Sequence, residues 1–535
     1  MSAHSTLSPA LVHPSGRAPL SSATPPATPP RPAWHIVLAL CIGQVLLWGF
    51  AFGLNYKAPE IDSAEQFLWS FSMESGYWKH PPMPSWIMHA LVQVFGPSVA
   101  LPFVAIQVCI VIALALTWRL GCEFMSPQRS LIAMALTSLV TYHNLGGDNF
   151  NHSSTLLPFQ AATVLFFFWA TRRGQLRLWA LTGLFAGLSM LVKYVALMPI
   201  AGLVLYLVLD RGMHQRRTLQ GLAVASAVFV LVLAPHAVWL QTTNFLPFQY
   251  AHAMAQPMAG WLSGAANLAE FLMIQGFRML PMLLGLAYVL ARRKDAAADA
   301  VQPVLPAQDR LFLWVAGLSP LLLTTLYGIL GRTELQTRWG TNGFLLSGLL
   351  AMLLVRRVDT PRMLRRTLQC VVAAHVFLSV GMTLSKTVVA DHFHRKTRAN
   401  FPGALLAKEA MEVWKAHTDA PLRIVVSDIW LGGNIVANSP QRIAVLIDGH
   451  MFKSPWVDEQ AVRDCGALVL DNQTTGVTGA ADNSPVLNGL MARASTTGSW
   501  NLPWAVSQQQ ATDSATGVVR WGIIEPQEAG ACKIR

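Results

Sequence analysis

Long apolar runs alternate with short polar segments through the first two thirds of this chain. A helix needs about 20 mostly apolar residues to cross a lipid bilayer. Runs that approach this length lie at residues 34–54, 98–118, 128–143, 154–171, 178–192, 195–209, 219–240, 275–291, 311–331, 341–355 and 366–386. The pattern therefore predicts a mainly α-helical, polytopic membrane protein with about 11 transmembrane helices.

Arginine-rich loops separate several of these runs and predict the orientation of the chain. They are residues 172–177, 210–217, 291–295 and 356–366. If the N-terminus is cytoplasmic, about 11 spans place all of these loops in the cytoplasm, where positive charge gathers in membrane proteins. Losing or adding one span in the middle of the chain would destroy this agreement. An odd number of spans then sends the C-terminal part to the extracytoplasmic side.

The pattern changes near residue 391, where short β-branched runs replace the long apolar ones. The segments "RIVVS", "RIAVLID", "CGALVLDNQ" and "VVRWGIIEP" predict strands, and "GALLAKEAMEVWKAH" predicts a helix before them. We therefore expect residues 391–535 to form a small soluble extracytoplasmic α/β domain. Residues 34–390 form the membrane domain, with a first outer loop at 55–97. Residues 1–33 are rich in Pro, Ser, Ala and Thr, which predicts a disordered cytoplasmic tail.

Composition agrees with the membrane class. Hydrophobic residues make up 53% of the chain and charged residues only 12%, whereas soluble domains carry about 25% charged residues. The formal net charge of +12 is assigned to the cytoplasmic loops rather than to nucleic-acid binding. Cys465 and Cys532 lie in the polar C-terminal part, where an extracytoplasmic location would permit one disulfide. The sequence alone does not determine whether this disulfide forms.

The first outer loop is the segment that carries candidate chemistry. Its sequence from Ile61 to Trp86 is "IDSAEQFLWSFSMESGYWKHPPMPSW". Apolar residues recur at helical spacing within 63–74, and the aromatic residues suit a membrane interface, so an anchoring helix would explain part of the pattern. Such an anchor does not require Asp62 at the start of the helix and "KHPP" after its end. The loop is therefore the candidate functional site.

This loop resembles the first extracytoplasmic loop of polyprenyl-phosphate-dependent glycosyltransferases of the GT-C superfamily, the group that includes bacterial aminoarabinose transferases and protein O-mannosyltransferases. Bacterial members carry the pattern D-E-x-x-Y/W…G-x-x-x-H/K-P-P-L-x-x-W, which aligns with Asp62 to Trp86. The segments "GLFAGLSMLVKYVAL" and "APHAVWLQTTNFLPFQYA" extend the resemblance over residues 34–386. Ser63 departs from the pattern, because it stands where the family often has Glu.

The resemblance implies a GT-C architecture and a multi-pass enzyme of the bacterial inner membrane. Its members move a sugar from a polyprenyl-phosphate donor to a glycan, lipid or protein acceptor on the extracytoplasmic side. The resemblance also implies that Asp62 is the catalytic base, because the acceptor hydroxyl must lose its proton as it attacks the sugar. The phosphate leaving group needs nearby cations and hydrogen-bond donors. The residues expected to supply them are Lys79, His80, Lys193, Arg278 and Arg338.

The second outer loop, "NLGGDNFNHSSTLL", is expected to serve the acceptor. Many relatives have a second Asp here, and Asn151 stands nearest to that position. Either Asp148 replaces the family's Asp, or Asn151 and His152 bind the substrate through uncharged hydrogen bonds. A further outer segment, 245–277, fits either a flap over the site or a packing loop.

The sequence contains no phosphate-binding loop, dinucleotide fingerprint or paired metal-ligand spacing. We therefore expect no metal, and leave a divalent cation open as a cofactor. Expected partners are the donor, the acceptor and membrane lipids, and not nucleic acid. One alternative is a secondary transporter, which would have internal repeats and ionisable residues at mid-membrane. The other is a non-catalytic protein that binds polyprenyl lipid.

Overall fold

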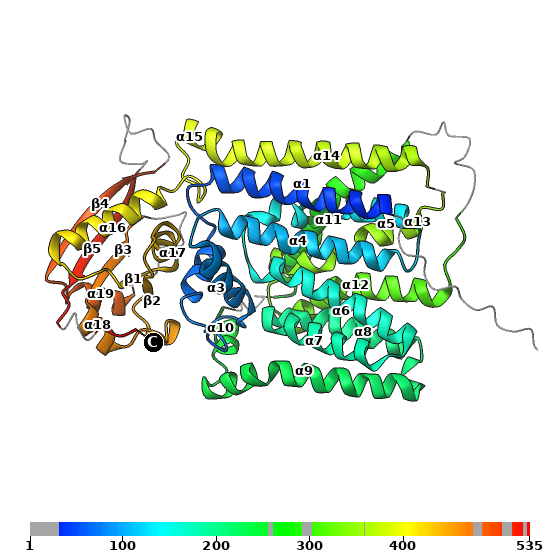
Figure 1. Cartoon of the computed structure of the whole chain (residues 1–535), viewed down its shortest axis with the longest axis horizontal. Coiled ribbons are helices and arrows are strands. Elements are labelled where there is room, and N and C mark those ends of the chain that lie inside the picture. Colours follow the sequence, from blue (N-terminus) through cyan, green and yellow to red (C-terminus); the bar gives the residue numbers. More distant parts are fainter. Residues whose placement is uncertain are drawn as a thin grey trace, which may run out of the picture.

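The computed structural model describes residues 31–254, 260–291, 302–357, 359–474, 484–504, 516–527 and 532–534. A long bundle of helices occupies most of the molecule, and a smaller sheet region lies at one end of it (Figure 1). The predicted tail, residues 1–33, falls almost wholly outside the described residues.

Each apolar run predicted from the sequence overlaps a helix of the bundle. These helices are α1 (Arg31–Asn55), α4 (Leu101–Gly121), α5 (Pro127–Thr137), α6 (His152–Arg173), α7 (Leu176–Val192), α8 (Leu197–Leu209), α9 (Arg216–Thr242), α11 (Trp261–Ala291), α12 (Ala307–Gly331), α13 (Ser347–Leu354) and α14 (Pro361–Leu384). Among the described residues, 7 helices are long and apolar enough to cross a membrane by length and composition. The chain is mostly helical, and the count of about 11 spans stays a prediction.

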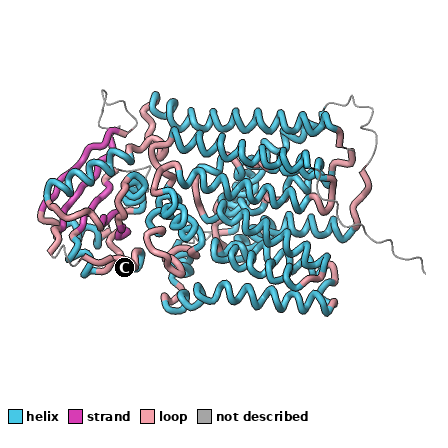
Figure 2. Tube along the Cα trace, in the orientation of Figure 1, coloured by secondary structure: helices cyan, strands magenta, loops and turns pink. Residues whose placement is uncertain are grey.

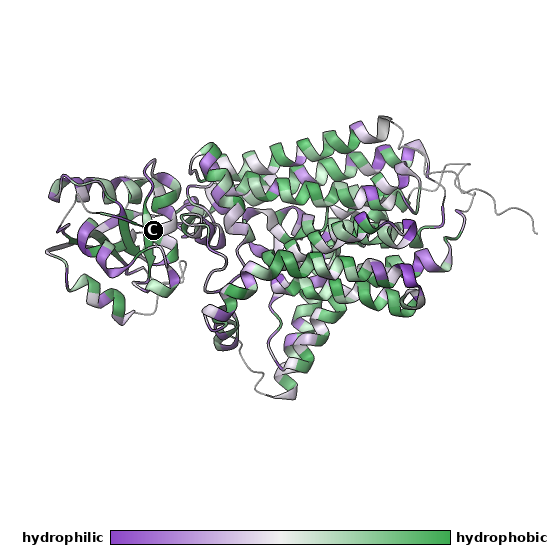
Figure 3. Ribbon diagram, turned by 60° about the horizontal axis from the view of Figure 1, so that its bottom comes forward, coloured by the Kyte–Doolittle hydropathy of each residue, from purple (hydrophilic) through white to green (hydrophobic). Residues whose placement is uncertain are grey.

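The outer surface of the bundle is apolar along the length of its helices. Leu231 on α9 is 74% exposed and Phe377 on α14 is 77% exposed. Hydrophobic residues cover the middle of the bundle and hydrophilic residues gather towards its ends (Figure 3). Such a surface suits a hydrocarbon environment, because it would be unfavourable in water.

Short helices α5 and α13 lie inside the bundle, where irregular backbone is tolerated because other helices cover it. Both helices are mostly buried. Irregular 3₁₀ turns adjoin them, at Thr141–His143 and Leu145–Asp148 after α5, and at Thr337–Gly343 before α13. These turns bring polar side chains to one end of the bundle.

The C-terminal part contains a five-stranded sheet with the strand order β2-β1-β3-β5-β4. Its elements are α16 (Gly403–His417), β1 (Ile424–Ser427), α17 (Ile429–Asn438), β2 (Ala444–Ile447), α18 (Glu459–Cys465), β3 (Ala467–Asn472), α19 (Pro485–Met491), β4 (Thr496–Pro503) and β5 (Thr516–Ile524). The sheet and its covering helices stand apart from the bundle in Figure 2. Strands β2, β1 and β3 are parallel and β5 and β4 are antiparallel. A disulfide joins Cys465 to Cys532.

The first outer loop lies between the bundle and this sheet region. It contains α2 (Ile61–Trp69) and α3 (Met83–Phe95). Helix α2 ends earlier than the expected 63–74 segment, and its residues from Ser63 onward are buried instead of lying on a membrane surface. The reason is that α2 packs against α17: a Cβ added at Gly433 would lie 2.4 Å from the Cβ of Ala64. The sheet region thus helps to fix the helix that carries Asp62.

Candidate active site

Asp62 lies in the first turn of α2 and connects three segments that are distant in sequence. Its carboxylate accepts hydrogen bonds from Asn149 Nδ2 at 2.9 Å and from Arg338 Nη1 at 2.6 Å. The side chains of Arg338 and Asp62 are 57% and 30% exposed. An exposed ion pair adds little to stability. Its accessibility instead leaves the carboxylate open to a substrate.

Ser63 fixes the second outer loop beside Asp62. Its hydroxyl donates to Asn149 Oδ1 at 3.1 Å and accepts from the Phe150 backbone N–H at 2.8 Å. Ser63 and Asn149 are both buried. At the position where the family often has Glu, this chain therefore has a short hydroxyl that orients the amide in contact with Asp62. Sequence reasoning missed Asn149, because nothing in the sequence links it to α2.

A cavity of about 330 Å³ adjoins this pair. Asn149 and Arg338 line it, together with four other charged side chains and several neutral ones. The remaining lining residues are Glu60, Tyr142, Leu145, Gly146, Asp148, Asn151, Ser154, Arg278, Thr341, Met382 and Lys386. The structure thus brings Asp148, Asn151, Arg278 and Arg338, predicted from separate segments, around one space.

Acidic and basic groups alternate along one wall of this cavity. Lys386 Nζ lies 2.6 Å from the Asp148 carboxylate and 3.4 Å from Glu60, and Arg398 lies 3.3 Å from Glu60. Burial and the nearby Asp148 raise the pKa of Glu60, and Lys386 and Arg398 oppose that rise. Asp148 is therefore engaged by a lysine. Sequence reasoning missed Glu60 and Lys386, although a lone lysine at the outer end of the last apolar run was a usable signal.

Arg278, on α11, also lines this cavity. Its guanidinium lies 5.1 Å from the centre of the Tyr142 ring, at cation–π distance. The Tyr142 hydroxyl lies 2.9 Å from Gln275 Oε1 and 2.6 Å from the Thr337 carbonyl oxygen, so it connects α11 to the turn that carries Arg338. No carboxylate in the described part of the chain lies within ion-pairing distance of Arg278. This cation therefore remains available to an anion.

Lys193 and two histidines, His80 and His152, lie together near Asp62. Lys193 Nζ donates to Ser153 Oγ at 2.7 Å. Burial and the neighbouring Arg338 lower the pKa of Lys193 to about 8, and the Asp62 charge opposes this shift. The rings of His80 and His152 are 4.1 Å apart. Burial lowers the pKa of His80 well below its ordinary value, helped by His152 and the lysines around it. His80 is thus neutral at physiological pH.

Lys79 lies beside this group but is already paired. Its ammonium lies 2.6 Å from the Glu65 carboxylate and 4.7 Å from the centre of the Trp78 ring. The Glu65 charge raises the pKa of Lys79 against the opposing effect of burial. Lys79 thus adds to the positive electrostatic potential at the site, while its ammonium group donates a hydrogen bond to Glu65.

Two further expectations concern metals and the 245–277 segment. The described residues contain no group of three His, Cys, Asp or Glu side chains that could hold a metal ion. Helix α10 (Leu246–Met254) packs Tyr250 against Trp78, with ring centres 4.8 Å apart. Residues 255–259 lie outside the described residues, so the choice between a flap and a packing loop stays open.

Comparison with known proteins identifies the class. Residues 79–239 match the family of dolichyl-phosphate-mannose-protein mannosyltransferases. The chain is 26% identical to lipopolysaccharide core galacturonosyltransferase RgtA of Rhizobium johnstonii, over 75% of this chain and 79% of that protein. It is 24% identical to lipid A galacturonosyltransferase RgtD of the same organism, over 61% of this chain and 66% of that protein.

The fold is similar to that of ArnT from Cupriavidus metallidurans bound to undecaprenyl phosphate, with a TM-score of 0.55, 12% identity, and coverage of 92% of this chain and 98% of that one. The apo form of the same protein gives a TM-score of 0.57. The chain therefore has the GT-C fold. The resemblance to polyprenyl-phosphate-dependent glycosyltransferases is confirmed, and the protein is a membrane glycosyltransferase.

Proposed function

We propose that this enzyme transfers a sugar from a polyprenyl-phosphate donor to a hydroxyl of an extracytoplasmic acceptor, with Asp62 as the general base. The observation that carries the proposal is the accessible Asp62 carboxylate, held by Arg338 and Asn149 at the edge of a charged cavity. We also propose an orientation in the membrane in which the Asp62 site faces the extracytoplasmic side and the N-terminus and the arginine-rich loops are cytoplasmic. The membrane domain is residues 34–390, and the sheet region, residues 391–535, is an extracytoplasmic domain.

The proposed reaction is one displacement at the anomeric carbon. The acceptor oxygen forms a bond to that carbon while its proton passes to the Asp62 carboxylate. The bond between the anomeric carbon and the phosphate oxygen breaks, and the phosphate keeps the electron pair. Lys193, neutral His80 and Arg338 are placed to stabilise that charge through hydrogen bonds and electrostatic attraction. Attack from the face opposite to the phosphate would invert the anomeric configuration.

Asp148 is proposed to contact the acceptor, and Asn151 is proposed to shape the loop that carries Asp148. Asp148 is paired with Lys386, so it can accept a hydrogen bond from an acceptor hydroxyl without needing to take its proton. Asn151 caps α6 by accepting from the backbone N–H groups of Ser153 and Ser154. Its amide nitrogen faces the Asn149 carbonyl at 3.1 Å. Asn151 therefore shapes the loop more than it supplies free hydrogen-bond groups.

The transferred sugar is proposed to be a hexuronic acid, and the acceptor a lipopolysaccharide core or lipid A. Two relatives are named as galacturonosyltransferases for those acceptors. Arg278 supplies a matching feature, because a guanidinium without a carboxylate partner can bind a sugar carboxylate through two parallel hydrogen bonds. The donor phosphate is the competing anion for this residue.

Transfer by the full-length protein in liposomes tests the proposal. The donors are a radiolabelled polyprenyl-phosphate hexuronate, the matching neutral hexose donor, and a nucleotide hexuronate, with lipopolysaccharide as acceptor. We expect transfer from the lipid-linked hexuronate and none from the nucleotide. Arg278→Gln should lower hexuronate transfer and leave hexose transfer unchanged. Equal loss with both lipid donors would assign Arg278 to the phosphate. Transfer from the nucleotide would contradict the proposed donor class.

A further inference from the structure

A second cavity lies at the end of the bundle remote from Asp62. Its volume is about 250 Å³. The loop between α4 and α5, the segment 302–306, the first turns of α12 and the end of α13 form its walls. None of the sugar-transfer residues proposed above lines it.

A buried arginine holds the wall of this cavity together. The Arg129 guanidinium donates to the carbonyl oxygens of Met352, at 2.6 Å, and of Val355, and pairs with Asp359 at 2.7 Å. Its side chain and that of Asp359 are only 6% and 5% exposed. The end of α13 is therefore fixed, and the charge of Arg129 is neutralised within the protein.

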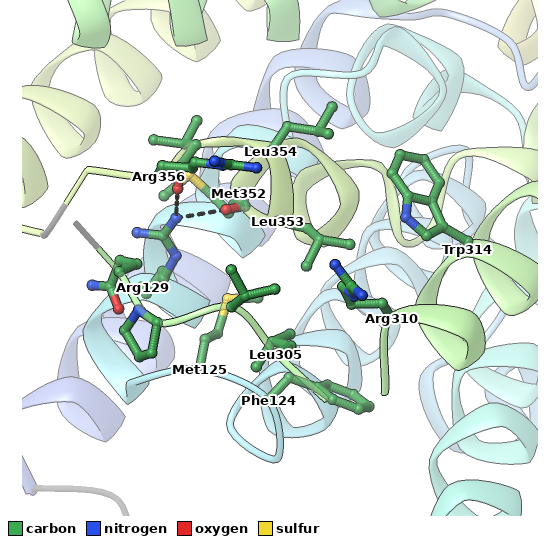
Figure 4. A pocket seen from close by; sticks show the side chains of 14 residues that line it. Phe124, Met125, Arg129, Leu305, Arg310, Trp314, Met352, Leu353, Leu354 and Arg356 are labelled. Carbon is green, nitrogen blue, oxygen red and sulfur yellow. Dashed lines mark hydrogen bonds between the residues drawn. The ribbon is translucent and has the colours of Figure 1, made fainter. Parts of the chain in front are cut away.

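Two other arginines of this cavity differ from Arg129 both in their burial and in the compensation of their charge. Arg310 and Arg356 are exposed, and both line the cavity. In the described ranges, no carboxylate lies within ion-pairing distance of either one. Figure 4 shows Arg310 reaching in from α12 and Arg356 from the chain after α13, with Leu353 between them. Among the described residues, the cavity thus presents two guanidinium groups that no carboxylate neutralises.

The rim of the same cavity is apolar. Leu354 is 68% exposed and Val304 is 63% exposed. Trp314 and Phe124 also line the cavity, and Trp is a residue that favours the boundary between lipid and water. Two cations that no carboxylate of the described residues neutralises, beside exposed aliphatic side chains, match a molecule with an anionic head and hydrocarbon chains.

We propose that this cavity binds the phosphate headgroup of an anionic phospholipid in the leaflet opposite to the sugar-transfer site. In the proposed orientation this is the cytoplasmic leaflet, so the inference rests on that orientation. Arg310 and Arg356 bind the phosphate oxygens by charge-assisted hydrogen bonds, and Leu354 and Val304 contact the acyl chains. A phosphate ion in solution shares the headgroup chemistry but would make no use of the apolar rim.

Native mass spectrometry of the detergent-solubilised full chain tests this site. The protein is titrated with phosphatidylglycerol, with phosphatidylcholine, and with phosphatidylglycerol in the presence of inorganic phosphate. The test variant is Arg310→Gln/Arg356→Gln. The matched control is Arg216→Gln/Arg217→Gln, which removes the same charge from exposed residues at the start of α9.

We expect preferential binding of phosphatidylglycerol by the native protein and the control, weakened by about 30-fold in the test variant, given roughly 1 kcal/mol for each basic residue. Equal weakening in both variants would show a general charge effect and overturn the proposal. Displacement of the lipid by an equal concentration of inorganic phosphate would also overturn it. The binding readout needs no sugar donor, so failure here is distinguishable from failure of the proposed transfer reaction.

Discussion

The two cavities at opposite ends of the bundle differ in how their cations are compensated. At the Asp62 end, Arg338 pairs with Asp62 and Lys386 pairs with Asp148. Of the three cations that line that cavity, Arg278 alone has no carboxylate within ion-pairing distance among the described residues. At the other end, Arg310 and Arg356 both lack an acid in the described chain. A carboxylate can take the proton of a hydroxyl group, whereas cations alone can only hold an anion. The charge pattern therefore fits the two proposed roles, sugar transfer at the Asp62 end and anion binding at the other end.

The two ends also differ in what covers them. Trp69 and Tyr77 of the first outer loop belong to the same hydrophobic core as the strands of the C-terminal sheet. Two cations that flank this junction, Lys386 and Arg398, pair with Glu60, close to Asp62 in the chain. A substitution in the sheet region should therefore alter the position of Asp62 and leave the cavity lined by Arg310 unchanged.

Among variants that keep Asp62, Arg338→Gln should have the largest effect. It removes both the ion pair to Asp62 and a cation at the developing phosphate charge, so we expect kcat/KM for sugar transfer to fall by about 100-fold. Arg332→Gln is the control, because this exposed residue of the same loop does not line the cavity. A loss below about twofold in steady-state assays would mean that the ion pair is only structural.

Gly433→Ala tests the coupling between the sheet region and α2. The added Cβ would lie 2.8 Å from the Ala64 Cα, so one backbone must move. We expect a loss of about 1–3 kcal/mol in stability, together with slower transfer. Thermal unfolding followed by tryptophan fluorescence measures the first effect. Gly489→Ala, inside α19, places a Cβ that would meet nothing within 4 Å, so it should leave transfer unchanged and raise stability by up to about 1 kcal/mol. Equal behaviour of the two variants would refute the coupling.

The smallest expected effect is a pH dependence at Lys193. Its pKa of about 8 means that the side chain is charged below that pH and loses its proton above it. Donor KM should therefore rise by up to about tenfold between about pH 7 and about pH 9. Lys193→Arg keeps its charge through this range and should flatten the profile. A profile that is the same in both proteins would remove Lys193 from donor binding.

The sequence predicted where the helices of the bundle lie, and it named two residues, Asp62 and Arg338, that the structure pairs, while their catalytic roles stay predictions. These two residues are 276 positions apart in the chain. Asp62 was predicted from the motif of the first outer loop, and Arg338 was predicted from the side of the membrane on which it was expected to lie. Strands β1, β2, β3 and β5 were predicted because their β-branched runs are continuous. Strand β4, "TTGSWNLP", was not predicted, because its Gly, Asn and Pro residues are uncommon inside strands and obscure the alternation of more and less exposed residues along this edge strand.

The partners of the site residues could not be predicted in the same way. Ser63, Asn149 and Lys386 acquire their roles only through contacts between segments that the fold brings together. The anchoring helix that the pattern at 63–74 also allowed is instead a buried helix, for a related reason. Its amphipathic pattern is equally suited to a buried helix, and the choice depends on α17, which lies far along the chain. Local sequence patterns thus indicated which segments carry the candidate site residues, and tertiary packing determined which side chains contact those residues.

Measurement of donor binding and sugar transfer on one preparation of Asp62→Asn tests the central claim most directly. The substitution keeps the shape of the side chain and its contact with Asn149, but removes the base. We predict that transfer falls by roughly 10²–10⁴-fold, while the affinity for the polyprenyl-phosphate sugar changes by less than about threefold. Undiminished transfer would contradict the assignment of Asp62 as the base. Parallel loss of binding and transfer would make Asp62 a donor-binding residue instead.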